Sequence, residues 1–490
     1  MKTLNKIKVL ILTMVLIIAG SCTQDFDQMN VNPNAATVVP ATNVLLRAQI
    51  STASVLFGER LDVYYAGTYA GHTAAIGLGD YEYRVDINNS MWRSMYISMT
   101  YFVDAMKLAQ AEGNTHLYAA ALTMKAYTAQ QTTDMWGKIP YSEAFRLAEG
   151  IVYPKYDEQR DVYMAILAEL KEAADLFNNG TGAIGAGDYL LKGDLDKWKR
   201  FANSTRLRVA LRMSGVEEAK AKEVIAEVLG NPTTYPILAT NAQNVYFWYP
   251  GVAPDQELWF RRMGSLTGVK TDQYRTNNVL IKALKNNNDP RLPVYADKNK
   301  YGVYKGYDLY DGQTRDTSNN GNNVSHIGDR FGNDPKGFSP FMNCAEVFFG
   351  LAEIYERGLY AGNAQQAYET GIRMALSENG IGAPAIDQFL TEPEVAWGGG
   401  TTTNLYKIRF QKWICLFKQS VEAWSENRRT DVPLIDGVSE NYASQHNRPP
   451  FRMAYADEEK SLNINFPLDV VESDIFYGTQ VWWDTRTGIR

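Results

Sequence analysis

Residues 134–144 have the sequence DMWGKIPYSEA, which predicts the end of one helix and the start of a second element. Glycine is common just after a helix C-terminus, so Gly137 is expected to follow the last helical residue. Pro140 cannot continue a helix because it has no backbone N–H. Ser142 and Glu143 offer hydrogen-bond acceptors near the start of the following element. The stretch therefore predicts a turn between two packed elements.

Helices are predicted on both sides of this turn. The segment from Trp92 to Glu112 and the segment from Leu117 to about Thr132 carry apolar residues at steps of three and four. The short turn between them predicts an αα-hairpin. The same pattern predicts further helices over residues 159–177, 195–213, 217–229, 345–357, 364–376 and 404–427, and one that begins at about residue 41.

Helix pairs of about 34 residues are typical of tetratricopeptide repeats. The closest approach to that pattern combines Ala352, Gly358, Ala364 and Tyr368. Because this match is degenerate, it supports only a helical solenoid scaffold. The predicted fold class is mainly α, with a tetratricopeptide-like helical hairpin scaffold and a large loop-rich insertion that forms the ligand-binding side.

Two segments interrupt the helical pattern. Residues 66–87 contain four glycines followed by closely spaced tyrosines, and residues 231–340 are rich in Gly, Asn, Asp, Pro and Tyr. A long irregular insertion in a helical protein is usually functional or disordered, and its aromatic content favours function. We expect a single domain over residues 41–490, with helical repeats mainly in 41–230 and 341–430 and loops in 231–340 and 431–490.

The N-terminal segment has the features of a secretory signal peptide. Three lysines precede an apolar run of about a dozen residues, which is shorter than the ~20 residues of a membrane-spanning helix. Residues 19–22 read AGSC, which resembles the lipobox of bacterial lipoproteins, where the cysteine is acylated and becomes the new N-terminus. We therefore expect a signal peptide over residues 1–21, an acylated Cys22 and a tether over residues 22–40. Ordinary secretion with a chance cysteine is the alternative.

Charge and cysteine content exclude other classes. Removing the three signal lysines from 49 Lys and Arg leaves 46 against 55 Asp and Glu, a net charge near −9. An acidic chain without a basic block repels phosphate backbones, so no nucleic-acid partner is expected. Cys344 and Cys415 are the cysteines besides Cys22, so there is no disulfide framework. Each lies in an apolar helical pattern, which favours buried free thiols over a bridge.

Several phrases of the sequence, taken together, resemble the SusD/RagB-like lipoproteins. Residues 134–144 match the family signature D-x-[W/F/Y]-G-D-I-P-Y-x-E-A, with Lys138 where the family usually has Asp. Further phrases follow in order over essentially the whole chain, at residues 156–163, 193–208, 289–292, 411–413 and 422–429. These phrases also have a structural interpretation, which we prefer: their arginines, Arg206, Arg208, Arg428 and Arg429, are expected to bind buried carboxylates and carbonyls.

The resemblance implies a specific role. SusD-like proteins are surface-exposed, lipid-anchored proteins of the outer membrane of Bacteroidota that capture nutrients, usually oligosaccharides and in some members peptides. They cap a SusC-like TonB-dependent transporter and open and close over it like a lid. A tetratricopeptide-like layer faces the transporter, and the ligand site is built on loops elsewhere. The expected partners are thus the transporter, a glycan or peptide, and outer-membrane lipid through Cys22.

Catalytic motifs are not found in the sequence. None of the four histidines stands in a metal-binding spacing, and there is no nucleophile elbow, phosphate loop or dinucleotide fingerprint. A glycosidase pair of carboxylates comes from distant segments and cannot be recognised from sequence. A surface glycan or peptide hydrolase and a repeat adaptor without a small ligand therefore remain alternatives from the residues alone, whereas the resemblance implies binding without turnover.

No cofactor is expected. The loop over residues 307–334 carries Asp and Asn oxygens that would suit Ca²⁺, but no EF-hand spacing is present. A solvated acidic loop is the preferred interpretation, and a calcium site lacks the support of a motif.

The ligand site is predicted where the early Gly-rich loop meets the long insertion, because both interrupt the helical pattern and carry tyrosines expected to be exposed. Rings would stack on a sugar face, and charged groups would fix its orientation. The tryptophans of the helical patterns (Trp92, Trp136, Trp198, Trp413 and Trp424) are expected to be core. The candidate ligand-binding residues are Tyr81, Tyr83, Tyr307, Tyr310, His326, Asp329 and Arg330.

Overall fold

The computed structural model describes residues 39–76, 81, 84–266, 270–271, 273–309, 323–436, 438, 446–469 and 479–490. Residues Ala41–Arg490 form one compact unit. The predicted signal peptide, Cys22 and nearly all of the tether lie outside the described residues, as do Tyr83 and Tyr310.

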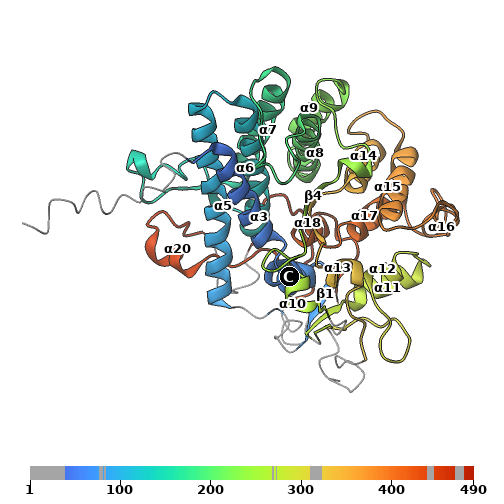
Figure 1. Ribbon diagram of the computed structural model, residues 1–490. Helices are drawn as coiled ribbons and strands as arrows, with labels where there is room; N and C mark the ends of the chain where they lie inside the picture. The colour runs from blue at the N-terminus through green and yellow to red at the C-terminus, as the bar shows by residue number, and fades with distance from the viewer. Residues whose placement is uncertain are drawn as a thin grey trace, which may run out of the picture. The chain divides into compact units, whose positions relative to one another are not determined.

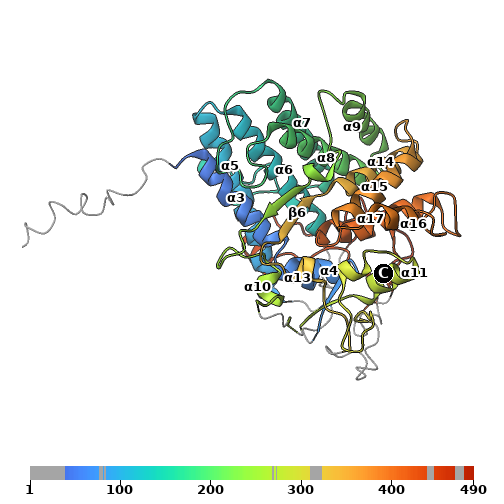
Figure 2. The same cartoon turned by 45° about the vertical axis from the view of Figure 1, so that its right-hand side comes forward.

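Helices dominate the described chain, which confirms the predicted mainly α fold class. α5 packs against α3 and α6, and the contacts continue in chain order from α6 to α9. Figures 1 and 2 show these helices side by side in the upper part of the molecule. Their bounds are α3 (Ala41–Leu56), α5 (Val85–Ala111), α6 (Thr115–Trp136), α7 (Gln159–Asn179), α8 (Leu195–Met213) and α9 (Glu218–Gly230).

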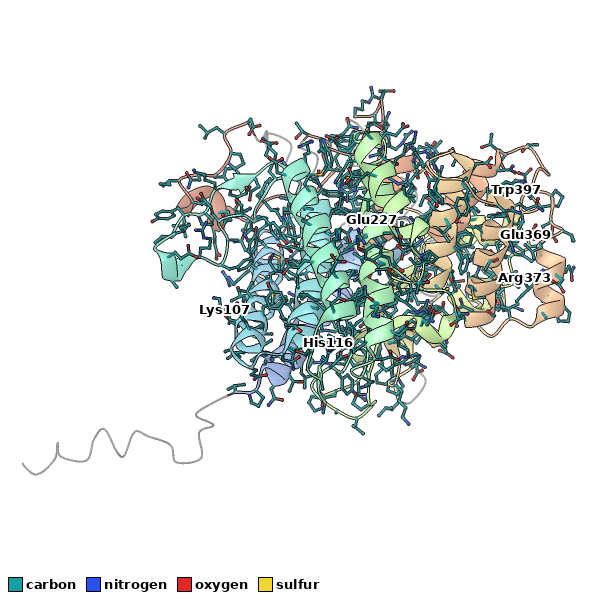
Figure 3. The ribbon with its side chains drawn as sticks, turned by 90° about the horizontal axis from the view of Figure 1, so that it is seen from above. Lys107, His116, Glu227, Glu369, Arg373 and Trp397 are labelled. Atoms are coloured by element: carbon teal, nitrogen blue, oxygen red, sulfur yellow. The ribbon has the colours of Figure 1, made fainter. Side chains whose placement is uncertain are left out.

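A second group of helices continues this layer. α14 (Cys344–Glu356) and α15 (Ala364–Glu378) form the predicted second hairpin, and α14 also packs against α8 and α17. Seen from above, Lys107 of α5 and Arg373 of α15 lie at opposite ends of the layer (Figure 3). The remaining helices of this group are α16 (Ala383–Phe389), α17 (Asn404–Cys415) and α18 (Ser420–Thr430).

The predicted single helix over residues 404–427 is wrong, because the chain forms α17 and α18 with a break between them. At the break Lys418 has a left-handed backbone, with φ of 69°. Its buried ammonium group lies 2.9 Å from the buried carboxylate of Glu257. The backbone N–H of Ser420 then donates to the Asp62 carboxylate at 2.9 Å. The break thus turns a lysine inward to a carboxylate from a distant segment.

The insertion over residues 231–340 contains more regular structure than its composition predicts. Its elements are short. They are η3 (Asn241–Gln243), β4 (Val245–Trp248), α10 (Phe260–Met263), β5 (Tyr274–Thr276), α11 (Asn278–Asn286), α12 (Leu292–Tyr295), α13 (Asp329–Gly332) and β6 (Phe338–Met342). α10, α11, α12 and α13 lie below the helical layer in Figures 1 and 2, whereas β4 and β6 lie against that layer.

Strands of the described chain pair in two-stranded antiparallel sheets. β1 (Thr73–Ala75) pairs with β5, β2 (Ile139–Pro140) with β3 (Tyr156–Asp157), and β4 with β6. The other short elements are the π-helix η1 (Arg60–Tyr65), α4 (Ala66–Tyr69), the 3₁₀ turn η2 (Leu147–Glu149) and α20 (Asp457–Leu462). The early segment predicted as a loop thus contains α4 and β1.

The turn at residues 134–144 forms where the sequence predicts it, but the element that follows, β2, lies before Ser142 and Glu143 and does not begin at them. α6 ends at Trp136, and Gly137 follows with φ of 85°, a conformation that glycine adopts readily. The indole N–H of Trp136 donates to the carbonyl of Ala454 at 2.9 Å. Pro140 lies in β2, which pairs with β3. This signature stretch therefore packs the first helices against the C-terminal segment.

The other expectations about the core are also confirmed. Cys344 and Cys415 are free and buried. The arginines of the family phrases bind carboxylates or carbonyls: Arg206 binds Glu227, Arg208 binds Glu346, Arg429 binds Glu353, and Arg428 donates to the carbonyls of Asp134 and Phe451. Trp92, Trp136, Trp198, Trp413 and Trp424 are all buried. Among the described residues, no helix combines the length and apolar character needed to cross a membrane.

Candidate ligand-binding site

The two segments predicted to form the site meet in the structure. β1 of the early segment pairs with β5 of the insertion, with Thr73 opposite Thr276. The chain at Tyr307 pairs with the end of β5. The backbone N–H of Tyr307 donates to the carbonyl of Thr276, and its carbonyl accepts from the backbone N–H of Asn278, each at 2.9 Å. We call this region, formed by β1, β5 and residues 307–309, the junction. The elements are close together in the lower part of Figure 1.

The two described tyrosines of the predicted site, Tyr81 and Tyr307, are buried, so the expectation that they are exposed is wrong. Tyr81 is 5% exposed, and its ring packs edge-on against Tyr69 with 5.3 Å between centroids. Tyr307 is 9% exposed. A tyrosine ring is mostly apolar, so packing against the neighbouring chain removes it from water at a favourable free energy. Tyr83 and Tyr310 lie outside the described residues.

The three remaining predicted residues differ in their surroundings. Asp329 is 75% exposed and lies 2.8 Å from the ammonium group of Lys270. The hydrogen bond from Lys270 lowers the pKa of Asp329. Arg330 is 31% exposed and lies 3.5 Å from the carboxylate of Glu378, and its guanidinium lies over the ring of Phe338 at 5.1 Å. The structure therefore leaves Asp329 exposed on the insertion surface and His326 half-buried, and it holds the half-buried Arg330 against Glu378.

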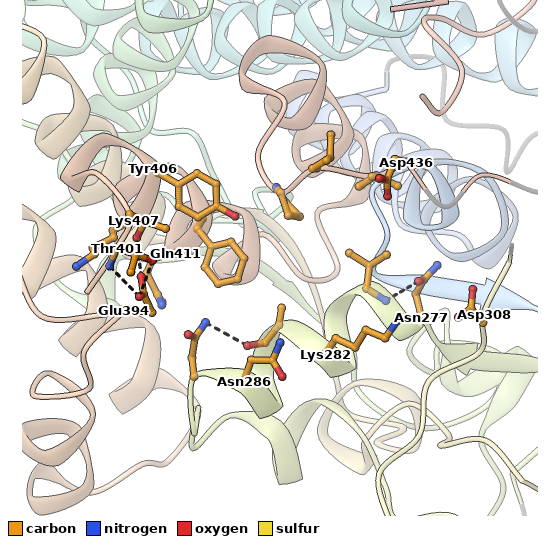
Figure 4. Close-up of a pocket in the computed structure, with 18 of the residues that line it drawn as sticks. Asn277, Lys282, Asn286, Asp308, Glu394, Thr401, Tyr406, Lys407, Gln411 and Asp436 are labelled. Atoms are coloured by element: carbon orange, nitrogen blue, oxygen red, sulfur yellow. Dashed lines mark hydrogen bonds between the residues drawn. The ribbon is translucent and has the colours of Figure 1, made fainter. Parts of the chain in front are cut away.

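A pocket of about 570 Å³ opens beside the junction. We call it the α11–α17 pocket, because these helices form facing walls, and residues 433–436 close a third side (Figure 4). Asp308 and Leu309 belong to both the junction and the pocket lining, and Asn277, which also lines the pocket, directly follows β5. The polar and aromatic side chains that line it are Asn277, Lys282, Asn286, Asn287, Asp308, Glu394, Thr401, Thr402, Tyr406, Lys407, Phe410, Gln411 and Asp436.

Two charged side chains, Lys407 and Glu394, hold the loop at one edge of the pocket through hydrogen bonds. The ammonium group of Lys407, a buried side chain, donates to the carbonyls of Pro393, Ala396 and Gly399, the second at 2.6 Å. The carboxylate of Glu394 accepts hydrogen bonds from the Thr401 backbone at 2.9 Å and from the hydroxyl groups of Thr401 and Thr402. These bonds lower the pKa of Glu394. The loop over residues 393–402 is thus fixed before any ligand arrives.

The α17 wall is aromatic. Tyr406 and Phe410, one helical turn apart, are half-buried and stack with 5.8 Å between centroids and 18° between planes. Phe410 in turn contacts the ring of Trp413 at 5.8 Å. In Figure 4 the hydroxyl group of Tyr406 points into the pocket. Helical periodicity could have placed these two rings on one face, but nothing in the sequence places that face beside α11.

The α11 wall is polar. Lys282 and Asn286 are exposed and also one turn apart. Asp308 accepts a hydrogen bond from Asn278 at 2.9 Å, and Asp436 is exposed on the third side. Sequence reasoning missed these residues, because single polar residues on a helix surface are too common to predict a site. Within the described ranges, no cluster of three or more His, Cys, Asp or Glu is placed to hold a metal ion.

The sequence matches a known family over most of its length. The SusD-like family model, described as starch-binding and associating with the outer membrane, matches residues 33–456. The chain belongs to the SusD-like family. No curated protein matches it. The family membership predicted from the ordered phrases is therefore confirmed.

Solved structures share this SusD-like fold. A SusD homologue from Parabacteroides distasonis has 21% identity and a TM-score of 0.79, over 91% of this chain and 97% of that chain. A SusD homologue from Bacteroides fragilis has 22% identity and a TM-score of 0.73, over 92% and 100%. A structure named as a chitin-binding protein has 23% identity and a TM-score of 0.75, over 91% and 100%. At these identities the likeness shows the fold alone, a tetratricopeptide-like helical scaffold.

Proposed function

We propose that this SusD-like protein is a cell-surface lipoprotein that captures oligosaccharides and delivers them to a SusC-like TonB-dependent transporter. The observation that carries the proposal is the family match over residues 33–456, because that family is described as starch-binding and outer-membrane-associated. The similar fold of a chitin-binding protein supports a glycan as the ligand. The protein binds its ligand without turnover and needs no cofactor.

Ligand contact is proposed on the insertion side, around the junction. Asp329 is exposed and His326 half-buried, so the Asp329 carboxylate can accept hydrogen bonds from sugar hydroxyls and the His326 ring can donate or accept them. For Tyr81 and Tyr307 we propose a structural role instead: their buried rings hold the early segment and the insertion in position. Tyr83 and Tyr310 remain proposed stacking residues, and Arg330 a proposed contact that would have to leave Glu378.

Anchoring through Cys22 is part of the proposal. A single acyl chain binds a membrane only marginally, since each buried CH₂ contributes ~0.8 kcal/mol, so multiple acylation is expected. Cys22→Ala should release the protein in soluble form or stall its processing. Fractionation of that variant with the outer membrane, in cells that lack the transporter, would show that the anchor lies elsewhere.

The test of the function has two arms. Calorimetric titration of the purified protein against oligosaccharide and peptide pools should show binding to an oligosaccharide. Incubation with the same pools, followed by chromatography, should show no cleavage. Cleavage would favour a surface hydrolase on a helical scaffold, and the absence of any binding would favour a repeat adaptor. Co-purification of the transporter with tagged protein from outer membranes tests the delivery step.

A further inference from the structure

We infer that the α11–α17 pocket is a separate subsite for an uncharged saccharide, with Tyr406 and Phe410 as its stacking wall. The inference rests on the proposed function and names a ligand class and residues for it. A volume of about 570 Å³ lies within the range of small-ligand pockets. The pocket is lined by residues from four stretches, 277–287, 308–309, 394–411 and 433–436, and none of these lining residues belongs to the predicted set of contact residues.

The aromatic wall matches the apolar face of a sugar ring. The near-parallel rings of Tyr406 and Phe410 present a continuous apolar surface at the pocket. C–H groups of a pyranose pack on such rings, while its hydroxyl groups need donors and acceptors at the ring edge. The Tyr406 hydroxyl points to the pocket interior and makes no hydrogen bond to the described residues, so it is available to a ligand.

The opposite wall supplies the polar groups that hydroxyls require. Lys282 offers three N–H donors, and Asn286 offers two donors and an acceptor. Both are exposed, and their side chains make neither ion pairs nor hydrogen bonds within the described part of the chain. Figure 4 shows this wall facing the α17 rings across the pocket. A ligand held between the walls would therefore stack on one side and form hydrogen bonds on the other.

The backbone of the walls disfavours a peptide. Peptides that bind as an added strand form main-chain hydrogen bonds to an exposed strand edge. The facing walls are helices, whose backbone N–H and C=O groups are largely satisfied within the helix. Recognition here must therefore come from side chains, which suits a saccharide with hydroxyls around its ring.

The charge of the lining selects the saccharide class. Three carboxylates (Asp308, Glu394 and Asp436) and two ammonium groups (Lys282 and Lys407) line the pocket. Three carboxylates against two ammonium groups leave the lining with a net charge of −1. An acidic sugar would be repelled, whereas an uncharged saccharide would not.

The test uses the detergent-solubilised full chain with maltohexaose, cellohexaose and chitohexaose as uncharged probes and hexagalacturonate as the acidic probe. The double variant Lys282→Ala/Asn286→Ala should bind the preferred uncharged probe at least about tenfold more weakly, as should Tyr406→Ala. Lys285→Ala is the matched control, since Lys285 is exposed on α11 but does not line the pocket. It should bind like the unaltered protein. The double variant changes only exposed side chains, so it keeps the test valid if Tyr406→Ala fails to fold.

The possible outcomes distinguish a failure of the subsite inference from a failure of the proposed function. If an uncharged probe binds and both pocket variants bind it like the unaltered protein, the subsite is overturned and the proposed function stands. Tighter binding of hexagalacturonate than of every uncharged probe overturns the ligand class. If none of the probes binds the unaltered protein, this inference is overturned, and the titration against the oligosaccharide pools decides the proposed function.

Discussion

Arg212 of α8 and Asp134 of α6 form an ion pair in the protein interior, with 2.9 Å between Nη1 and Oδ2 and side chains 1% and 0% exposed. Asp134 also accepts a hydrogen bond from the indole of Trp483 at 3.0 Å. Arg212 binds two further carboxylates on α18, Glu422 and Glu426. Asp134, the first residue of the signature stretch, thus connects α6, α8 and the C-terminal segment. This contact gives the stretch a structural role.

Breaking this pair should destabilise the protein strongly. Arg212→Met leaves buried carboxylates without their cation, which typically costs 3–5 kcal/mol for a buried pair, so we expect a loss of about that size. The free energy of unfolding from urea titrations measures it. Lys222→Met removes the partner of Glu218 in an exposed pair and should cost less than about 1 kcal/mol. Equal losses in the two variants would contradict the assignment of the interior network as the main ionic contribution.

Asp62 should make stability fall as the pH rises. Burial raises the pKa of Asp62 from 3.8 to about 7, although hydrogen bonds from Ser420 and the charge of Lys418 lower it. Between pH 4 and 7 the folded protein therefore holds a proton that the unfolded chain has lost. Its stabilising contribution is complete below pH 4, is lost progressively up to pH 7 and is constant above.

Asp62→Asn tests this slope. The amide keeps an acceptor for Ser420 but does not titrate, so the difference in unfolding free energy between variant and unaltered protein should move in favour of the variant by roughly 2–3 kcal/mol from pH 5 to pH 8. Urea titrations at those two pH values measure it. Parallel pH profiles would show that Asp62 is ionised throughout.

The titration of His72 should change the stability with pH in the opposite direction. Burial lowers the pKa of His72 from 6.5 to about 3, and the ring packs 4.7 Å from Trp413 and 5.6 Å from Phe417. The unfolded chain binds a proton below pH 6.5 that the folded protein does not, so stability is lost as the pH falls from 6.5 towards 3. Between pH 4 and 6.5 this loss offsets the gain from Asp62.

His72→Phe should therefore reveal the Asp62 slope. The variant keeps an aromatic ring but removes the titration, so its stability should increase as the pH falls from 6.5 to 4. Asp62→Asn should show the reverse, a decrease over the same interval. Thermal unfolding across this interval distinguishes the two, and identical profiles for both variants would refute the assignment.

The sequence predicts the bounds of those helices that depend on local periodicity alone. α8, for example, begins and ends where its apolar pattern does. The break at Lys418 could not be predicted, because it depends on Glu257, a carboxylate from a distant segment. Likewise, the burial of Tyr81 depends on its contact with Tyr69. The meeting of the two irregular segments was predicted from their shared composition, but the strand pairing that joins them was not.

The α11–α17 pocket was beyond sequence reasoning for the same reason. Its walls come from segments that are far apart in the chain, and each wall alone has an ordinary helical pattern. Only the packing of the insertion beside α17 brings Lys282 and Tyr406 to one cavity.

Lys407→Met should loosen the edge of this pocket without unfolding the protein. The substitution keeps a long unbranched side chain but removes the donor to three backbone carbonyls, each bond contributing about 1 kcal/mol. We expect a loss of roughly 1–3 kcal/mol and faster amide exchange confined to residues 393–402. Hydrogen-exchange mass spectrometry measures the second effect. Lys285→Met, on the exposed surface of α11, is the control and should change neither quantity. Unchanged exchange in residues 393–402 of Lys407→Met would mean that the loop is held by Glu394 and its threonine partners alone.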